Sequence, residues 1–420
     1  MPRAIKSVKG TRDFLPPETR LWAAVEETAR RVFGTYGYEE IRTPVLEETD
    51  LFVRSVGEST DIVGKEMYTF LDKKGRSLTL RPESTASVVR AFVQHGLANQ
   101  PLPAKLFYIG PQFRYERPQK GRYRQFHQIG AELIGDPGPE TDAELLLMLL
   151  RFLGELGFRD LLVQLNTVGD DQSRAAYREG LRSFLEPHRD ELGEDSRRRL
   201  DSNPLRILDT KNPEERELLR EAPELAEFLS QESREHFEGL RRALDRFGVA
   251  YEIEPRLVRG LDYYTRTVFE IISEGLGAQD AIVGGGRYDG LVAELGGPEL
   301  PGIGFAIGED RLIEVLPEQF SRAVAGSEPI VVVPVGEVAA VEALELAERL
   351  RGAGLAVIAE LSGRSVKAAL KKADRSGARL AILIGDDELG KGLVTLRDLK
   401  AADQFTVPRA DLVARVEEML

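Results

Sequence analysis

Residues 113–135 read FRYERPQKGRYRQFHQIGAELIG, in which a polar loop joins two segments with the alternating pattern of β-strands. The loop, residues 114–124, contains five basic residues and one acidic residue. Arginine and lysine side chains in such a loop can fold over a polyphosphate, because guanidinium groups bind phosphate oxygens bidentately. The stretch therefore predicts an antiparallel hairpin with a phosphate-binding tip. The alternative is a solvated hairpin whose charges only face water.

The returning strand of this hairpin carries polar residues in phase. Phe126, Gln128 and Glu132 share one face, whereas Ile129 and Leu133 lie on the other. A Gln and a Glu on a sheet face that helices cover lower the stability unless they meet a ligand or hydrogen-bonding partners. This pattern indicates that Gln128 and Glu132 line a binding pocket.

The surrounding sequence predicts an α+β domain. Strand-like runs occur close together, without a regular βαβ rhythm, which favours an antiparallel sheet flanked by helices. Residues 169–247 are charged and helix-forming, without strand signals, which indicates a helical insertion within this domain. We expect helices over 19–36, 84–96 and 141–157, and strands over 40–46, 67–71, 77–81, 105–114, 124–134, 251–257, 267–272 and 281–284.

The last part of the chain has a different pattern. Strand-like runs alternate with helix-like segments, which predicts a separate C-terminal α/β domain with a mostly parallel sheet. The small residues of SRAVAGSE, 321–328, are typical of a linker. We therefore predict a first domain over 1–325, with its insertion at 169–247, and a second over 326–420. The strands of the second are expected at 330–335, 356–359, 380–384 and 393–396, and its helices at 338–352 and 366–376.

Composition excludes several classes of protein. The 420 residues are 42% hydrophobic and 30% charged, as in ordinary globular domains, and no apolar run is long enough to span a membrane. The chain has no cysteine, and no two of its four histidines have a metal-binding spacing, so we expect neither thiol catalysis nor a zinc site. The net charge of −13 argues against a general nucleic-acid coat and leaves room only for a local basic patch. A cytoplasmic location is the simplest expectation.

Four other stretches have compositions typical of binding sites. Residues 256–270 read RLVRGLDYYTRTVFE, and their arginines and adjacent tyrosines could line a polar pocket, although a turn with packed tyrosines is the alternative. The glycine-rich runs GGGRYDG, 284–290, and GIGFAIG, 302–308, lack the spacing of a dinucleotide-binding loop. GDDELGKG, 385–392, is not a P-loop, because Gly392 stands where the Mg²⁺-binding Ser or Thr is needed.

With these stretches combined, the sequence resembles the class II aminoacyl-tRNA synthetases, and among them the histidyl-tRNA synthetase family. Five segments resemble the three class II motifs and two histidine-specific motifs, and the resemblance extends over essentially the whole chain. RPESTA, 81–86, departs from the family pattern at Ser84, where we expect Gly. The five segments are 25–51 with Pro44, 113–135 and GIGFAIGEDRL (302–312) for the class motifs, then RGLDYYTRTVFE (259–270) and AIVGGGRYDGL (281–291).

The resemblance implies a two-step reaction. A histidine carboxylate attacks the α-phosphate of ATP to give histidyl-adenylate and pyrophosphate, and the histidyl group then passes to the 3′ end of its tRNA. Because two anions must meet, fixed positive charge has to offset their repulsion. The resemblance assigns catalysis to Arg259 and Arg114, on opposite sides of the α-phosphate. No general base is required for the first step.

Further roles also follow from the resemblance. ATP, which arrives with Mg²⁺, would be bound by Arg114, Glu116, Arg122, Phe126 and Arg311. Phe126 would stack on adenine, and Arg122 and Arg311 would hold the distal phosphates. An imidazole offers one donor and one acceptor nitrogen, which Glu132 and Tyr264 would complement. The full set of expected histidine-binding residues is Glu83, Ser84, Thr85, Arg114, Gln128, Glu132, Arg259, Tyr263, Tyr264 and Tyr288.

The resemblance implies an anticodon-binding role for the C-terminal domain and a homodimeric enzyme without a tightly bound cofactor. Residues 328–420 contain 13 basic and 15 acidic residues, so tRNA binding needs a local patch. The candidates are Arg364, Lys367, Lys371, Lys372 and Arg375, with a solvated helix face as the alternative.

One rival function comes from a different class. A regulatory subunit of ATP phosphoribosyltransferase is a non-catalytic paralogue of this catalytic domain, and it binds histidine without charging tRNA. The C-terminal α/β domain argues against that function, as do the basic loop with Arg114, Lys120 and Arg122, and Arg259.

Overall fold

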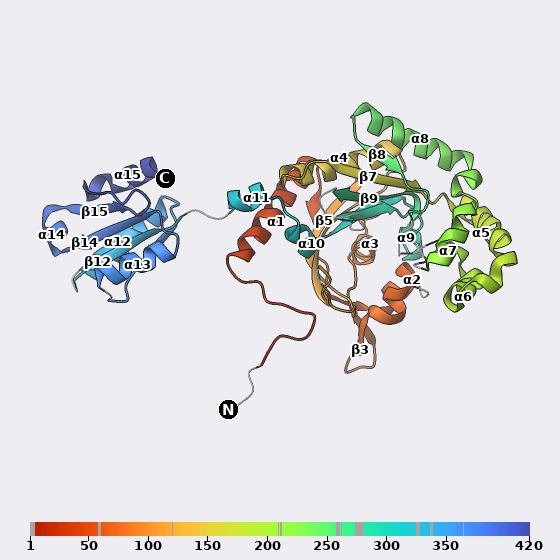
Figure 1. Cartoon of the computed structure of the whole chain (residues 1–420), viewed down its shortest axis with the longest axis horizontal. Coiled ribbons are helices and arrows are strands. Elements are labelled where there is room, and N and C mark those ends of the chain that lie inside the picture. Colours follow the sequence, from red (N-terminus) through yellow and green to blue (C-terminus); the bar gives the residue numbers. More distant parts are fainter. Residues whose placement is uncertain are drawn as a thin grey trace. The chain divides into compact units, whose positions relative to one another are not determined.

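The computed structural model describes residues 5–57, 60–119, 121–208, 210, 212–257, 261, 263–273, 281–324, 328–336, 339–363 and 365–420. The chain forms two compact units, Met1–Val324 and Ala325–Leu420 (Figure 1). Each unit has its own main sheet and its own hydrophobic core. No helix among the described residues is long and apolar enough to cross a membrane.

An eight-stranded sheet forms the centre of the larger unit, in the order β1-β5-β6-β11-β10-β9-β7-β8. The pairs from β5 through to β7 are antiparallel, and only the edge pairs β1–β5 and β7–β8 are parallel among the described residues. The antiparallel sheet expected from the sequence is therefore confirmed. The strands are β1 (Glu39–Glu40), β5 (Ala104–Phe113), β6 (Gln125–Ile134), β7 (Leu161–Thr167), β8 (Tyr251–Ile253), β9 (Thr265–Ser273), β10 (Val283–Arg287) and β11 (Gly302–Gly308).

Two long helices, α1 (Glu18–Thr35) and α4 (Pro139–Glu155), pack with one face of this sheet into a single core. Val25, Ala29 and Val32 of α1 recur at helical spacing and are buried in it. Ile129 and Leu133 of β6 reach the same core, as their positions on one face of the strand predict. The short helices α10 (Glu309–Glu314) and α11 (Glu318–Val324) follow β11.

The opposite face of the sheet holds α3 (Thr85–Gln94) and α9 (Leu291–Glu294), which pack around Ile134, Tyr263 and Tyr288. A small three-stranded sheet adjoins them, in the order β2-β4-β3. Its strands are β2 (Leu46–Glu48), β3 (Tyr68–Leu71) and β4 (Ser77–Leu80), with α2 (Thr49–Val56) beside them.

Four helices lie between β7 and β8, with no strand among the described residues of this stretch. They are α5 (Asp171–Leu185), α6 (Glu194–Ser202), α7 (Pro213–Leu218) and α8 (Gln231–Arg246). Leu181, Leu185 and Leu200 belong to a small core of their own, which allows this insertion to fold as a module. Asp170 begins α5 as an N-cap, because its side chain accepts a hydrogen bond from Ser173 N at 2.8 Å.

One expectation for this unit was wrong in detail, and two strands, β7 and β11, were not predicted. The single strand expected at 40–46 is replaced by two short strands, β1 and β2. The chain is interrupted between them because the Thr43 carbonyl accepts a hydrogen bond from the Arg81 guanidinium (2.9 Å) and Pro44 has no N–H for a hydrogen bond between strands. β7 lies between segments that read as helical, and its apolar residues could not be distinguished from helix. The glycine-rich run 302–308, for which no strand was predicted, forms the strand β11 in the middle of the sheet.

The smaller unit is an α/β domain with the sheet order β13-β12-β14-β15-β16. β12 pairs in parallel with both neighbours, but β14–β15 and β15–β16 are antiparallel, so the sheet is mixed rather than mostly parallel. The links before β15 and β16 are too short for a crossover between parallel strands. The elements are β12 (Ile330–Val335), α12 (Ala339–Gly352), β13 (Val357–Ala359), α13 (Val366–Arg375), β14 (Leu380–Gly385), α14 (Asp386–Lys391), β15 (Leu393–Asp398), β16 (Gln404–Pro408) and α15 (Leu412–Met419).

Candidate active site

A cavity of about 470 Å³ opens on the α3 side of the large sheet. Its floor is formed by β6, β9, β10 and β11, and its rim includes the loop after β5 and the start of α10. Polar side chains dominate the lining. The side chains that line it include Glu83, Thr85, Tyr108, Arg114, Glu116, Arg122, Tyr123, Phe126, Gln128, Glu132, Tyr263, Tyr264, Glu270, Tyr288, Asp310 and Arg311.

One end of the cavity is cationic. Arg114 is fixed by its Nε, which donates to the Pro82 carbonyl at 2.9 Å, and its guanidinium lies 5.2 Å from the centre of the Phe126 ring. Glu116 faces this group, with its carboxylate 3.9 Å from Arg114 and 3.7 Å from Arg122. Arg311 lines the same end from α10. The guanidinium groups of Arg114, Arg122 and Arg311 thus converge where an anionic ligand would enter.

The hairpin loop is held in place by the N-terminal segment. Arg12 donates to Asp310 (3.2 Å), and its guanidinium lies 4.9 Å from the centre of the Tyr123 ring. Asp310 also accepts from the backbone N–H of His127 at 2.8 Å. Arg124 N donates to the Gly10 carbonyl at 2.7 Å. Residues 10–12 therefore tie the basic loop to the segment that carries Arg311.

The other end of the cavity holds two buried carboxyl groups, of which Glu83 is the first. Its oxygens accept from the backbone N–H groups of Thr85 (2.6 Å) and Ala86 (3.0 Å) at the start of α3. Burial raises the pKa of Glu83, although these hydrogen bonds and Arg114 act in the opposite direction. A cation placed beside Glu83 would favour its charged form.

Glu132 is the second, and its side chain is fully buried on β6. Oε1 accepts from the Thr85 hydroxyl at 2.7 Å, and Oε2 accepts from the Tyr288 hydroxyl at 2.6 Å. Burial raises the pKa of Glu132 to about 8, against the effect of both hydroxyl donors. Each oxygen retains a further acceptor position, so the carboxyl group can receive an N–H donor from a ligand.

Aromatic rings enclose this end. Tyr263 and Tyr264 lie with ring centres 4.8 Å apart, and Tyr263 meets Tyr288 edge to face at 5.8 Å. Tyr108 lines the cavity from β5 and is buried. The pocket is therefore shaped for a flat, polar group of modest size.

Glycines in β11 make room for these side chains. A Cβ on Gly304 would lie 1.8 Å from Glu132 Oε2, and one on Gly302 would lie 2.3 Å from the Tyr288 ring. Both distances are far below van der Waals contact. These two glycines of β11 are therefore needed because any larger residue would overlap with the side chains of Glu132 and Tyr288.

The structure brings nearly all the sequence-predicted residues of the large domain to this cavity. Ser84 lies outside the lining, since its hydroxyl is buried and accepts from Gln112 Nε2 at 2.6 Å. Arg259 and Lys120 lie outside the described residues. The lining includes Glu83, Thr85, Arg114, Glu116, Arg122, Phe126, Gln128, Glu132, Tyr263, Tyr264, Tyr288 and Arg311.

Sequence reasoning missed several neighbours of these groups. Tyr108 and Gln112 lie on β5, directly across from Gly130 and Phe126 of β6. Their signal was the in-phase pattern of β5 itself, since both positions share the pocket face of the hairpin. Asp310 was passed over because its role in holding the loop depends on Arg12, almost 300 residues earlier.

The basic residues proposed for the smaller unit lie on α13. Lys367, Lys371 and Arg375 are exposed and spaced one turn apart along the helix. Lys372 is also exposed and forms an ion pair with Glu360. Arg364 lies outside the described residues. Among the residues that the structure describes, no group of three or more metal-ligating side chains could hold a metal ion.

Comparison with known proteins agrees with this geometry. The histidyl-tRNA synthetase family model matches residues 10–312, and an anticodon binding domain model matches residues 329–419. A histidine–tRNA ligase from Halorhodospira halophila is 51% identical over 421 residues, covering 100% of this chain and 99% of the relative. A crystal structure of the apo histidyl-tRNA synthetase of S. aureus superposes with a TM-score of 0.84 at 37% identity, covering 98% of this chain and 99% of the other.

The rival function has a weaker likeness. A Bacillus halodurans structure described as an ATP phosphoribosyltransferase regulatory subunit/histidyl-tRNA synthetase matches with a TM-score of 0.68 at 24% identity, covering 92% of this chain and 99% of the other. At that identity the likeness shows the fold alone. The cationic end, the buried carboxyl pair and the full-length match to a ligase sequence lead to one conclusion: the chain belongs to the histidyl-tRNA synthetase family.

Proposed function

We propose that this cavity is where the enzyme, a histidine–tRNA ligase, joins histidine to ATP and then passes the histidyl group to tRNA. The observation that carries this proposal is the pairing of two ends within one cavity. Arg114, Arg122 and Arg311 line one end, and the buried carboxyl of Glu132 lies at the other. Such an arrangement suits a ligand pair in which one is a polyphosphate and the other a small polar cation or amphoteric ring.

Histidine would occupy the carboxyl end. Its α-ammonium group would lie between Glu83, whose charged form it would stabilise, and Gln128, whose buried Oε1 has no hydrogen-bond partner among the described residues. One imidazole N–H would donate to Glu132, and Tyr264 would serve the other ring nitrogen. Tyr263 and Tyr288 would enclose the ring.

ATP would occupy the cationic end. Adenine would stack on Phe126, and Arg122 and Arg311 would hold the distal phosphates. Arg114, which is already fixed by the Pro82 carbonyl, would contact the α-phosphate from one side. Arg259 would contact the same phosphate from the other side. Mg²⁺ would enter as part of the MgATP substrate.

The first step forms a bond between a histidine carboxylate oxygen and the α-phosphorus and breaks the bond from that phosphorus to the bridging oxygen, so pyrophosphate leaves. The nucleophile is already ionised, and no proton has to be removed. Guanidinium groups that are fixed before the reaction offset the charge on the α-phosphoryl oxygens without having to move. This electrostatic stabilisation of the transition state would be the main source of the rate enhancement. In the second step a ribose hydroxyl of tRNA attacks the acyl carbon and AMP leaves.

The smaller unit would bind the anticodon arm of tRNA(His), and the face of α13 with Lys367, Lys371 and Arg375 is our proposed contact. We also propose a homodimer that works in the cytoplasm. Leu46, Phe70 and Leu71 support the dimer, since these large apolar side chains of the small sheet are exposed in the single chain.

ATP–pyrophosphate exchange tests the activation step directly. The purified protein is offered each of the twenty amino acids separately, without tRNA. We expect exchange with histidine alone, followed by charging when tRNA(His) is added. Histidine binding in calorimetry without any exchange would contradict the proposal and favour the regulatory function. Exchange with another amino acid would show that Glu132 and Tyr264 do not recognise the imidazole.

A further inference from the structure

The helical insertion contacts the sheet beside the histidine end of the cavity. Arg174 of α5 donates from Nη1 to the main-chain carbonyl of Tyr264 at 2.7 Å. Its side chain is only 16% exposed and also forms an ion pair with Asp171. A guanidinium that binds a backbone carbonyl fixes the course of the chain at Tyr264, whatever the tyrosine side chain does.

A second contact lies two residues further on. Arg266, in β9, has a φ of +50°, a conformation that residues other than glycine rarely adopt. Its N–H donates to the Gly169 carbonyl (2.8 Å) and its carbonyl accepts from Val168 N (2.7 Å), so its backbone is bonded to the start of the insertion. Unfavourable backbone conformations persist where the surroundings impose them. Here the insertion imposes this one.

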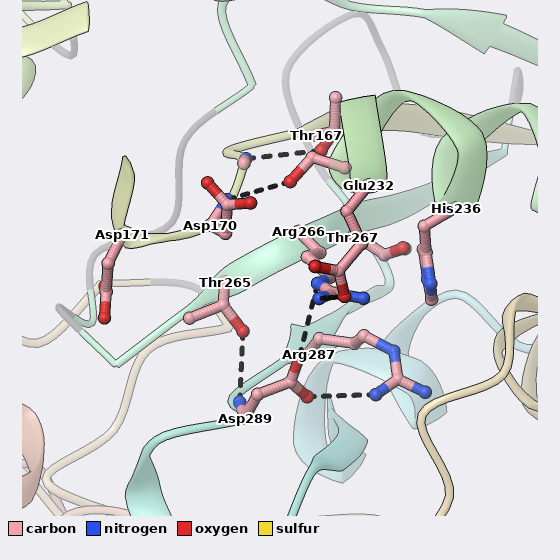
Figure 2. Close-up of polar contacts among 12 residues, drawn as sticks. Thr167, Asp170, Asp171, Glu232, His236, Thr265, Arg266, Thr267, Arg287 and Asp289 are labelled. Atoms are coloured by element: carbon pink, nitrogen blue, oxygen red, sulfur yellow. Dashed lines mark hydrogen bonds and ion pairs between the residues drawn. The ribbon is translucent and has the colours of Figure 1, made fainter. Parts of the chain in front are cut away.

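The Arg266 side chain continues the connection (Figure 2). It lies 2.5 Å from Glu232 of α8 and 3.6 Å from Asp289, and Asp289 accepts from Arg287 at 2.9 Å. In Figure 2 the side chains of Glu232, Arg266, Asp289 and Arg287 lie one after another in space, from the insertion to the end of β10. The backbone N–H of Asp289 also donates to the Thr265 hydroxyl at 3.0 Å, which fixes the backbone at this point. The ends of β9 and β10 are thereby tied to each other and to α8.

The innermost part of this network is fully buried. Arg287 and Asp142 have no exposed side-chain surface, and Arg287 Nε donates to Asp142 Oδ1 at 2.8 Å. The second oxygen of Asp142 accepts from the Thr267 hydroxyl (2.7 Å) and lies 2.9 Å from His236 Nε2 of α8. Moving one partner of a buried ion pair leaves the other charge buried and uncompensated, which destabilises the protein. The network therefore favours a single arrangement of these side chains.

The same strand ends carry the histidine subsite. Tyr264 directly precedes β9, and Tyr288 directly follows Arg287 at the end of β10. Neighbouring residues of an extended chain point to opposite faces. Arg287 accordingly points to Asp142, whereas the hydroxyl of Tyr288 reaches Glu132 in the cavity.

We propose that Arg174 and Arg266 are positioning residues for histidine: through them the helical insertion holds Tyr264 and Tyr288 in the geometry that binds the amino acid. The inference rests on the proposed function of the cavity. It makes histidine affinity depend on the insertion, whereas ATP affinity, which depends on Arg114, Arg122 and Arg311, does not. Neither positioning residue lines the cavity itself.

Arg174 gives the first test, by steady-state ATP–pyrophosphate exchange of the full chain. For Arg174→Ala we expect the KM for histidine to rise about tenfold, as loss of roughly 1.4 kcal/mol of binding would give, with kcat and the KM for ATP within about twofold of wild type. Arg174→Lys keeps one donor for the Tyr264 carbonyl and should recover most of the histidine affinity. Arg178→Ala is the matched control, since Arg178 is exposed one turn later on α5.

Arg266→Gly gives the second test, because glycine adopts a φ of +50° without strain and only the side chain is lost. We expect a selective rise of the histidine KM here too, and weaker histidine binding in calorimetry without ATP. A folded Arg174→Ala or Arg266→Gly variant with unchanged histidine KM, or with equal rises for histidine and ATP, would overturn the inference. Lack of exchange by the wild type would instead overturn the proposed function.

Discussion

The hydroxyl of Tyr288 donates to Oε2 of Glu132 at 2.6 Å, and this bond joins the residue after β10 to the C-terminal part of β6, near Ile134, across the intervening strand β11. β11 can lie between them only because Gly304 and Gly302 leave the space empty. The bond orients a buried carboxyl group before any ligand arrives. Pre-orientation of this kind reduces the cost of ordering a site on binding.

Glu132→Gln should weaken histidine recognition strongly. The amide keeps the shape of the carboxyl group but has one acceptor fewer and cannot become charged when the imidazole binds, and hydrogen bonds to charged groups contribute about 1.5–3 kcal/mol. We expect the histidine KM to rise by about 10- to 150-fold, with little change in the KM for ATP. Pyrophosphate exchange at varied histidine and at varied ATP measures both. Equal effects on the two substrates would contradict the assignment.

Glu309 should make the protein less stable as the pH rises. Its carboxyl is buried, neither oxygen has a hydrogen-bond partner among the described residues, and burial raises its pKa to about 9. Between about pH 4.5 and 9 the folded state keeps a proton that the unfolded state has released, so stability falls with increasing pH across this window. Above about pH 9 that loss is complete.

Glu309→Gln and Glu309→Leu test this relationship by thermal unfolding at pH 5 and pH 9. We expect either variant to exceed wild type in unfolding midpoint, with a larger difference at pH 9. Leucine, which leaves no polar atom unsatisfied, should be the more stable by about 1–3 kcal/mol. A difference that is the same at pH 5 and pH 9 would show that Glu309 is already ionised in the folded protein at pH 5.

Arg259→Ala should slow formation of histidyl-adenylate. If Arg259 contacts the α-phosphoryl oxygens as proposed, its removal should raise the barrier by about 2–4 kcal/mol, as for other donors at a developing charge. Transfer from supplied adenylate to tRNA should be nearly unaffected. Single-turnover rates for the two half-reactions separate these effects, and a comparable loss in both would refute the role in activation.

Removal of the residues after Gly326 should leave histidine activation intact and weaken tRNA charging. The large unit ends at Val324 and has its own sheet and core, so we expect it to fold without the smaller unit. Exchange and aminoacylation assays on the shortened chain provide the comparison. Loss of exchange together with charging would mean that the smaller unit also supports the active site.

Lys371→Ala should weaken tRNA binding without changing pyrophosphate exchange. One phosphate contact fewer reduces the steepness with which binding falls with salt, by about 0.7–0.9 in the log–log slope. Filter binding of tRNA at several salt concentrations measures this slope. Lys391→Ala, which removes a basic residue from α14 instead of α13, is the control. Identical slopes for both variants would exclude the α13 face as the contact.

Periodicity and loop chemistry were enough to predict the local framework. Val25, Ala29 and Val32 predicted the core face of α1, and the alternation around Gln128 and Glu132 predicted which side chains of β6 face the cavity. Both depend on side chains within one element, whose directions follow from the helix or strand repeat. The functional motifs could be read for the same reason, since their residues lie close together in the chain.

Only the tertiary structure determined what those motifs meet. β7 and β11 could not be predicted, because a short apolar run and a glycine-rich run give no distinctive period. The contacts from Arg12 to Asp310 and from Arg287 to Asp142 join residues far apart in the sequence. Nothing local requires either pair, because each is favourable only after the sheet has formed and excluded water. The sequence by itself determined most of the elements and the chemistry proposed for the site, and the packing of distant elements determined how the site residues are held in place.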